Sequence, residues 1–377
     1  MDFRKTDEQE LLIESLRELI ELECPESYFA ECDRLHKEPR KFRQVLSENG
    51  FSLLGVPEEF GGTPCDKLTQ IMVNEELSRL GAPEAHTSIG LRIHTIGLFG
   101  TKEQQLLTME AIKRGDYPFA LGISEPQAGS DNMSLTTTAT RKNGKVYING
   151  HKTFITHATY SPYMLTCTME PGTKRMSMWW VCLNAPGVRV QHLDKIGWNM
   201  AGTSEVYLDN VEIEEKDLIG KEGEGFSQLM ANFEFERLLM SASALGHAQG
   251  AFEDAALYAN QRVQFGKRIG EFQLVQEMLC NMYIKIQNMR HFVYRTAWEM
   301  DQGISIRINS ALCKYYTTRS AFEVVDDAMQ IMGAIGYTSE HRIARFWRDL
   351  RAYRLGGGTD EVLIHAASRP LLNIYSK

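Results

Sequence analysis

The stretch Phe233-Glu234-Phe235-Glu236-Arg237-Leu238-Leu239-Met240 lies inside a long helical pattern that runs from about Phe226 to Arg262 without an internal proline. At about 100° per residue, one face of this helix carries Leu229, Phe233, Glu236 and Met240, whereas Glu234 points nearly the opposite way, where water can solvate it. A carboxylate on an apolar stripe loses hydration and its pKa rises, as a general base near neutral pH requires. A structural ion pair, for example with Arg237, fits the same pattern, so the helix alone leaves both interpretations open.

Composition and charge limit the class of protein. The chain has 377 residues, 43% hydrophobic and 24% charged, which is enough for two or three domains. Its net charge of −8 argues against nucleic acid or an acidic membrane surface as a general partner, and no apolar run reaches the length of a membrane span. Seven cysteines and ten histidines are scattered, so neither disulfides nor a metal site is indicated. Without a signal-peptide core, we expect a cytoplasmic protein.

The order of the patterns predicts a helical region, a β region and a second helical region. Residues 1–118 begin with a capping box at Thr6 and Gln9 and show helical signals over 41–49, 67–80 and 93–115. Residues 119–225 contain short runs divided by turn residues, typical of a small antiparallel barrel or sandwich. Residues 226–377 contain four helical patterns, over 226–262, 271–301, 305–332 and from about 359, which suggest a four-helix bundle. The expected fold class is therefore α+β.

A row of arginines stands near the end of the chain, at positions 342, 345, 348, 351 and 354. Such a row usually marks a solvated helix face or a subunit contact. A single anion site for the whole row is less favoured, because a spacing of three drifts around a helix.

Four further motifs carry groups suited to a cofactor. Leu121 to Asp131 offers hydroxyls and flexible backbone, and Lys152 to Thr156 places an aromatic and a hydroxyl two residues apart on one strand face. Arg262 to Gly266, with Gln273 shortly after, suits a phosphate or nucleotide edge. Gly356 to Glu361 puts three glycines before a helix N-terminus, where free N–H groups favour an anion or a polarised oxygen. Each motif alone also fits an ordinary surface loop.

The order of these motifs on this layout resembles the acyl-CoA dehydrogenase family over essentially the whole chain. Ile123-Ser124-Glu125-Pro126 with Ala128-Gly129-Ser130-Asp131 is similar to the first signature of the family, and Gln330 to Tyr337 is similar to the second. Arg262 to Gly266 resembles the flavin-diphosphate segment that members lend to a neighbouring subunit. Within the family, segments 258–266 and 345–351 are most similar to the bacterial crotonobetainyl-CoA reductase group.

This resemblance implies a homotetramer that binds FAD and a CoA thioester, with an electron-transfer flavoprotein as redox partner. Carried over by position, the residues at FAD would be Ile123, Ser124, Phe154, Ile155, Thr156, Arg262, Gln264, Phe265, Gln273, Gln330, Gly333, Ala334, Thr359 and Glu361. Ser130 and Arg237 would bind the substrate. Phe154 stands where tryptophan is usual, Ser124 where threonine is common and Ala334 where glycine is usual. These changes keep an aromatic, a hydroxyl and a small residue, so they are compatible with FAD.

One departure concerns the catalytic base. Many family members carry the catalytic glutamate at the position of Gly357, and a glycine cannot abstract a proton. A minority, resembling isovaleryl- and long-chain acyl-CoA dehydrogenases, places it on the long helix at the position of Glu236. The helix-face argument and the resemblance thus reach the same residue, and we interpret Glu236 as the base. Gly357 would keep a catalytic role through its backbone N–H, which would donate to the thioester oxygen.

The resulting hypothesis is an FAD-dependent acyl-CoA dehydrogenase or enoyl-CoA reductase that interconverts an acyl-CoA and its 2,3-enoyl-CoA, for example crotonobetainyl-CoA or a related short acyl-CoA. An acyl-CoA oxidase or desulfinase-like flavoenzyme is the second interpretation. A non-catalytic assembly subunit with the same fold is the third. The acyl group and the direction of the reaction are not determined by the residues.

Overall fold

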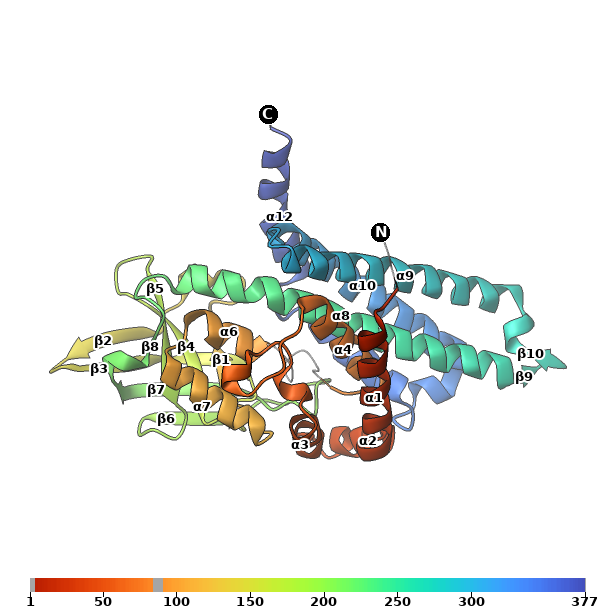
Figure 1. Cartoon of the computed structure of the whole chain (residues 1–377), viewed down its shortest axis with the longest axis horizontal. Helices are drawn as coiled ribbons and strands as arrows, with labels where there is room; N and C mark the ends of the chain where they lie inside the picture. The colour runs from red at the N-terminus through yellow and green to blue at the C-terminus, as the bar shows by residue number, and fades with distance from the viewer. Residues whose placement is uncertain (1–3, 84–90, 377) are drawn as a thin grey trace.

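The computed structural model describes residues 4–83 and 91–376 and shows two groups of helices with a β region at one end (Figure 1). The first group contains α1 (Asp7–Glu23), α2 (Glu26–Arg34), α3 (Arg40–Glu48), α4 (Lys67–Arg79), α6 (Leu91–Phe99) and α7 (Lys102–Lys113). The predicted α+β class, with a β region between two helical regions of the sequence, is confirmed. Within the described residues, no helix is both long and apolar enough to span a membrane.

The helix ends follow local capping signals. The predicted capping box of α1 is present, since the Thr6 hydroxyl accepts from the Gln9 N–H at 3.2 Å and the Gln9 side chain accepts from the Thr6 N–H at 3.1 Å. The prediction of one helix over 93–115 is wrong, because Gly100 ends α6 and a second capping box at Thr101 and Gln104 begins α7. Helix α2 was not predicted.

The β region forms one eight-stranded sheet in the order β6-β7-β3-β2-β4-β5-β8, with β1 paired to β4. Its strands are β1 (Phe119–Gly122), β2 (Thr138–Lys142), β3 (Lys145–Thr156), β4 (Tyr163–Met169), β5 (Met176–Cys182), β6 (Val188–His192), β7 (Thr203–Ile213) and β8 (Leu218–Ile219). The pairing is mostly antiparallel, as predicted, but β4 runs parallel to β1 and, at one residue pair, to β2.

The two faces of this sheet belong to different cores. One face, from β1, β3, β4, β5 and β7, encloses an apolar cluster that includes Ile148, Ile155 and Trp179. Side chains of β4 and β5 on the other face pack against α6, α7 and the beginning of the long helix α8, at Leu229 and Phe233. The β region is therefore fixed to the helices through its second face.

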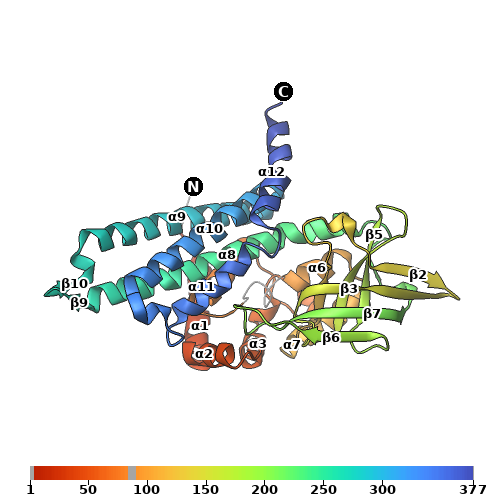
Figure 2. The ribbon, with the colours of Figure 1, turned by 180° about the vertical axis from the view of Figure 1, so that it is seen from behind.

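The second helical group contains α8 (Gly225–Gln261), α9 (Gln273–Asp301), α10 (Arg307–Met332), α11 (Arg342–Tyr353) and α12 (Asp360–Ile374), with the short strands β9 (Val263–Gln264) and β10 (Lys267–Arg268) between α8 and α9. Helices α8, α9, α10 and α11 share one core. Helix α12 contributes Leu363 and Ala367 to a small separate core with α10 and projects away from the bundle (Figures 1 and 2).

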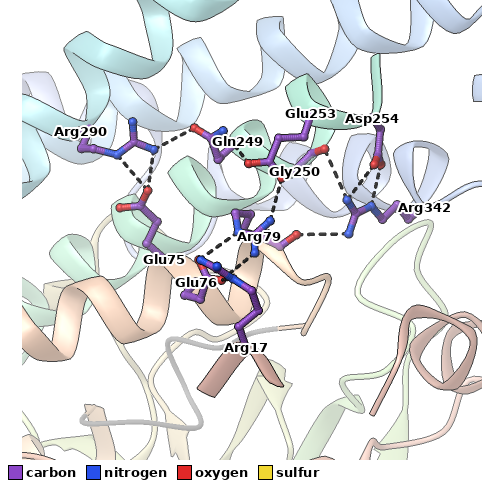
Figure 3. A network of polar contacts seen from close by, with 10 residues as sticks. All are labelled: Arg17, Glu75, Glu76, Arg79, Gln249, Gly250, Glu253, Asp254, Arg290 and Arg342. Atoms are coloured by element: carbon purple, nitrogen blue, oxygen red, sulfur yellow. Dashed lines mark hydrogen bonds and ion pairs between the residues drawn. The ribbon is translucent and has the colours of Figure 1, made fainter. Parts of the chain in front are cut away.

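A network of charged side chains ties the two helical groups together (Figure 3). Glu76 of α4 accepts from Arg17 of α1 at 2.8 Å and from Arg79 at 2.7 Å, and Arg79 pairs in turn with Glu253 of α8 at 2.7 Å. Arg290 of α9 contacts Glu75 of α4 at 2.7 Å. Because these partners come from α1, α4, α8 and α9, the network holds the first helices on the bundle.

Most of the arginine row does not form the solvated face that the sequence suggested as one interpretation. Arg342 binds Asp254 of α8 at 2.6 Å, Arg345 binds Glu26 of α2 at 2.8 Å, and Arg348 contacts Asp33 at 2.6 Å. Arg354 pairs with Asp360 at 2.6 Å. Most of the row therefore makes ion pairs within the chain that fix α11 against its neighbours.

Helix α8 joins these parts. Its 37 residues correspond to about 55 Å at 1.5 Å per residue. Leu229 and Phe233 lie in the core shared with the sheet, and Leu238 and Met240 lie in the core of the bundle. Glu236 therefore sits where α8 passes from one core to the other.

Candidate active site

The predicted apolar stripe of α8 is confirmed around Glu236. Leu229 and Met240 are each 1% exposed and Phe233 is 9% exposed, while Glu236 itself is half-buried. Burial raises the pKa of the Glu236 carboxyl, although the positive charges of Lys314, Arg237 and Arg92 oppose this rise. The predicted desolvation of this carboxylate is thus present in the structure.

The polar contacts of Glu236 are few. Asn232, one turn earlier on α8, donates to Glu236 Oε2 at 3.3 Å, and Asn232 is itself hydrogen-bonded to Thr95 of α6. Within the described parts of the chain, no cation lies at ion-pair distance from Glu236, and the adjacent Arg237 acts on its carboxyl only through its charge. The alternative of a structural ion pair with Arg237 therefore has no contact that supports it.

Glu234 differs from the expectation. The sequence placed it where water can solvate it, but Glu234 is half-buried and burial raises the pKa of its carboxyl, opposed by Arg237 and Arg307. The reason is that α10 begins at Arg307 beside this part of α8, so the opposite face of the helix is also partly covered.

The glycine loop before α12 reaches Glu236. An ideal Cβ on Gly357 would lie 3.7 Å from Glu236 Oε1 and 2.8 Å from Met240 Sδ. Gly357 and Gly358 have φ values of 62° and 102°, a region that other residues rarely adopt. Within the part of the chain that the structure describes, no acceptor contacts the N–H of Gly357. The loop therefore places an available backbone donor beside the carboxylate.

Two buried cations hold the carbonyls of this loop. Lys314 of α10 is 0% exposed, and its Nζ donates to Gly356 O and Gly358 O, each at 2.7 Å. Arg237 Nε donates to Gly357 O at 3.3 Å. Burial lowers the pKa of the Lys314 amine to about 7, with the charge of Arg237 acting in the same direction and Glu236 and Asp360 opposing it.

Lys314 was missed by the sequence analysis, although a signal existed. Ala311, Lys314 and Thr318 follow at helical spacing on a buried stripe of α10. The argument that singled out Glu236, a charged group on an inward-facing stripe, applies equally to Lys314. Arg237, expected at the substrate, is buried against the loop and the ring of Phe233.

A second group of predicted residues gathers at the end of β3. The N–H of Thr153 donates to Ser124 O at 2.9 Å, so the loop of Ile123 and Ser124 lies beside the strand. The pairing of β3 with β7 shifts between Lys152 and Ile155, and Phe154 at this bulge has a φ of 57° and is 71% exposed. Ile155 turns its side chain into the core of the β region, and Thr156 is half-buried.

A buried ion pair supports this group. Lys152 Nζ lies 2.8 Å from Glu125 Oε1 and 3.0 Å from Ile123 O. Glu125 also accepts from the N–H groups of Thr136 and Thr137 at 2.7 and 3.0 Å. Burial opposes ionisation of Glu125, but the Lys152 charge and these hydrogen bonds hold the pKa of its carboxyl at about 2. Neither member of the pair was singled out in the sequence for this role.

A third group lies at the far end of α8. Arg262, Gln264, Phe265 and Gln273 are all exposed. Phe265 and Gly266 have φ values of 51° and 78°, so they form a two-residue turn between β9 and β10 of the type with two left-handed residues. Phe265 is 94% exposed. Figures 1 and 2 both place this hairpin at the end of the molecule opposite the sheet.

The remaining predicted residues are spread over other surfaces. Gln330, Gly333 and Ala334 are exposed at the end of α10, and Ser130 is exposed in the loop after β1. Thr359 caps α12 by accepting from the Val362 N–H at 3.3 Å, and Glu361 is exposed in its first turn. The structure thus brings together Glu236 with Gly357 and Ser124 with the end of β3, and it keeps the hairpin apart from both.

Matches to known proteins cover nearly the whole chain. The N-terminal, middle and C-terminal domains of acyl-CoA dehydrogenases match residues 6–116, 120–211 and 223–372. The chain is 53% identical over 380 residues to the probable acyl-CoA dehydrogenase YdiO of Escherichia coli strain K12, with 100% of this chain and 99% of that protein aligned.

Solved structures agree in fold. Butyryl-CoA dehydrogenase from Megasphaera elsdenii is similar with a TM-score of 0.92 and 29% identity, over 99% of this chain and 100% of that one. A chain solved in work on the electron-transferring flavoprotein of Acidaminococcus fermentans is similar with a TM-score of 0.93 and 32% identity, over 99% and 100% of the two chains. The chain therefore belongs to the acyl-CoA dehydrogenase family of FAD-dependent oxidoreductases.

Proposed function

We propose that this protein interconverts an acyl-CoA and its 2,3-enoyl-CoA, with Glu236 as the base. The observation that carries the proposal is the position of Glu236, whose Oε1 lies 3.7 Å from the Cβ position of Gly357. A partly desolvated carboxylate and an available N–H donor at one place are what proton transfer next to a carbonyl requires.

The residues at the end of β3 fit a flavin ring. Phe154 offers an exposed aromatic face at a backbone conformation that bulky residues rarely adopt. Such strain persists where surrounding structure or a ligand compensates it, and it clusters at functional sites. Ser124 is bonded through its carbonyl to the Thr153 N–H, next to Phe154, and Thr156 follows two residues later, so we assign their hydroxyls to the polar edges of a flat ring that lies on Phe154.

The distal hairpin fits the diphosphate of FAD bound by another subunit. Between Glu236 and Arg262, α8 rises about 39 Å, so one chain presents these two residues to different sites. Phe265 repeats the combination found at Phe154, a left-handed backbone and an exposed aromatic ring. This repetition supports a homotetramer in which Arg262, Gln264, Phe265 and Gln273 serve a neighbouring subunit, with Gln330, Gly333 and Ala334 on the adenosine side.

In the proposed mechanism, Glu236 removes a proton from Cα of the thioester, or returns one in the reverse direction. The Gly357 N–H donates to the thioester oxygen while negative charge builds on it. Burial raises the affinity of the Glu236 carboxylate for a proton. The positive charges of Lys314 and Arg237 limit this rise in pKa and so favour the ionised form that accepts the proton. FAD, when bound, supplies the chemistry that accepts or returns the hydride at Cβ.

Substrate, location and redox partner extend this proposal. The resemblance of segments 258–266 and 345–351 favours a short acyl group of the crotonobetainyl-CoA type. A cytoplasmic location belongs to the same proposal and is supported by the 53% identity to a bacterial protein. The neighbour solved in work on an electron-transferring flavoprotein supports such a protein as redox partner.

The test is an anaerobic titration of the purified protein with a panel of acyl-CoAs and enoyl-CoAs, before and after chemical reduction. We expect yellow protein that loses its colour with one class of acyl-CoA and regains it with the matching enoyl-CoA. Protein that holds no FAD under any condition would instead indicate an assembly subunit. Rapid reaction of the reduced protein with oxygen would indicate an oxidase.

A further inference from the structure

The glycine loop needs an external restraint to act as a fixed donor. Gly356, Gly357 and Gly358 are consecutive, and glycine loses more backbone freedom on ordering than any other residue. A donor stabilises a developing charge well only when it is already in place before the reaction. Gly357 also has no side chain that could anchor the loop, so the restraint has to come from other residues.

Lys314 provides this restraint from both sides of Gly357. Its Nζ donates at 2.7 Å to the carbonyl before Gly357 and at 2.7 Å to the carbonyl after it. Lys314 Cε lies 3.5 Å from the Cβ position of Gly357. The carbonyl of Gly357 itself accepts from Arg237, so every carbonyl of the three-glycine loop is held by a buried cation.

These contacts fix the direction of the Gly357 N–H. In a planar trans peptide, the carbonyl of one residue and the N–H of the next point in opposite directions, and no cis peptide is present in the described chain. Because Gly356 O points at Lys314, the Gly357 N–H points away from it. That side is where, in the described residues, no protein acceptor meets this N–H.

We propose that Lys314 is the positioning residue that holds the Gly357 N–H in place as hydrogen-bond donor to the thioester oxygen. This inference rests on the proposed function. An amine that is 0% exposed is costly to bury unless its donors are satisfied, and Lys314 uses two of its three on this loop. Glu236 and Arg237 from α8 and Asp360 from α12 supply the surrounding charges.

The experiment measures polarisation of the carbonyl in bound thioester. Crotonyl-CoA, isotope-labelled at the thioester carbonyl carbon, is bound to the oxidised holoenzyme, and its carbonyl stretch is recorded by difference infrared spectroscopy. In the native protein we expect a shift to lower frequency on binding. In Lys314→Met most of this shift should be lost, and kcat should fall by at least about tenfold, towards the ~10²–10³ cost of losing an oxyanion donor. Crotonyl-CoA affinity and flavin content should change much less.

Two further variants make the result specific. Lys314→Arg keeps a charged donor and should recover part of the shift. Lys285→Met removes a lysine of α9 whose Nζ pairs with Glu323 at 2.9 Å on the surface, and it should leave the shift unchanged.

The outcomes separate the two proposals. If native protein shows no carbonyl shift and no change of colour with any acyl-CoA, the proposed function fails. If the native protein shows both the carbonyl shift and the colour change, but Lys314→Met keeps the full shift, only the proposed role of Lys314 fails. If Lys314→Met does not hold flavin, Lys314→Gln is measured in the same way. Loss of flavin in every Lys314 variant would assign this residue a purely structural role and overturn the inference.

Discussion

Glu236 Oε1 lies 3.7 Å from the point where a Cβ on Gly357 would stand. Glu236 on α8 and Gly357 before α12 are 121 positions apart in the sequence, yet they lie next to each other in the fold. This proximity gives a physical reason why a carboxylate in either place could serve one reaction. Under the proposed function, a glycine at position 357 is therefore compatible with a base at position 236.

We expect Glu236→Gln to abolish substrate-dependent loss of flavin colour while the protein stays yellow. Glutamine keeps the shape and hydrogen bonding of glutamate but cannot accept the proton, and loss of a general base costs about 10²–10⁴ in rate. Stopped-flow absorbance with acyl-CoA measures this. The matched control is Glu234→Gln, two residues away and half-buried, which should reduce normally. Near-native rates in Glu236→Gln would remove Glu236 from the mechanism.

The rate of flavin reduction by acyl-CoA should rise with pH. The base acts when deprotonated, and burial raises the pKa of Glu236, so the midpoint should lie above the usual glutamate value of about 4.3. Lys314→Met should move the midpoint higher, because the Lys314 charge is the largest influence opposing that rise. The corresponding contribution of Glu236 to folding stability is present below about pH 4.3 and is lost as pH rises through its folded pKa. A pH-independent rate in the native protein would contradict this assignment.

Moving the carboxylate from position 236 to position 357 should restore little of the activity that Glu236→Gln loses. In Glu236→Gln combined with Gly357→Glu, the new residue would adopt a φ near 62° and its Cβ would lie 2.8 Å from Met240 Sδ. Such backbone strain costs about 1–3 kcal/mol. Adding Met240→Ala removes the clash, so we expect more activity in the triple variant than in the double. Equal activity in both would show that Met240 does not limit the rescue. Colour loss with acyl-CoA and thermal unfolding are the two measurements.

The helix-face argument correctly predicted the buried stripe around Glu236, because the apolar residues of that stripe lie on α8 itself. The solvated face suggested for the arginine row was wrong for most of the row, because the environment of these arginines depends on distant segments. Arg345 pairs with Glu26, 319 positions earlier, and no local period reveals such a partner. The break at Gly100 was readable, since Thr101 and Gln104 repeat the capping box seen at Thr6 and Gln9. The bulge that exposes Phe154 arises from the pairing of β3 with β7 and has no signal in its own strand.

Loss of FAD and of assembly should occur together in Arg262→Ala. Arg262 is exposed at the distal hairpin, where its charge is expected to neutralise the diphosphate held by a neighbouring subunit. Flavin absorbance per subunit and light scattering after size-exclusion chromatography measure the two properties. Arg351→Ala, at an exposed arginine of α11, is the control and should change neither. A monomer with full flavin content would contradict a shared site.

Breaking the pair under the Ser124 loop should weaken both folding and flavin retention. Lys152→Met leaves Glu125 buried without its cation, which typically costs about 3–5 kcal/mol. Lys145→Met, on the same strand, removes an exposed contact with Glu212 of 3.3 Å and should cost at most about 1 kcal/mol. Chemical unfolding and flavin release measure the difference. Equal effects of the two substitutions would show that burial of the pair is unimportant.

The Lys152–Glu125 ion pair should also make the folding stability of the protein fall at acidic pH. Because the folded pKa of Glu125 is about 2, below the ordinary value of about 4.3, its stabilising contribution is present above about pH 4.3 and is lost as pH falls towards 2.

The length of helix α8 fixes the distance between Glu236 and the distal hairpin. If its two ends serve different active sites, the number of residues between Glu236 and Arg262 sets the spacing of those sites. One inserted residue would advance the hairpin by about 1.5 Å and turn it by about 100°, which no side-chain adjustment can reverse. Point substitutions along the exposed face of α8 leave that spacing intact. Substitutions on the exposed face of this part of α8 are therefore compatible with the proposed assembly, whereas insertions and deletions are not.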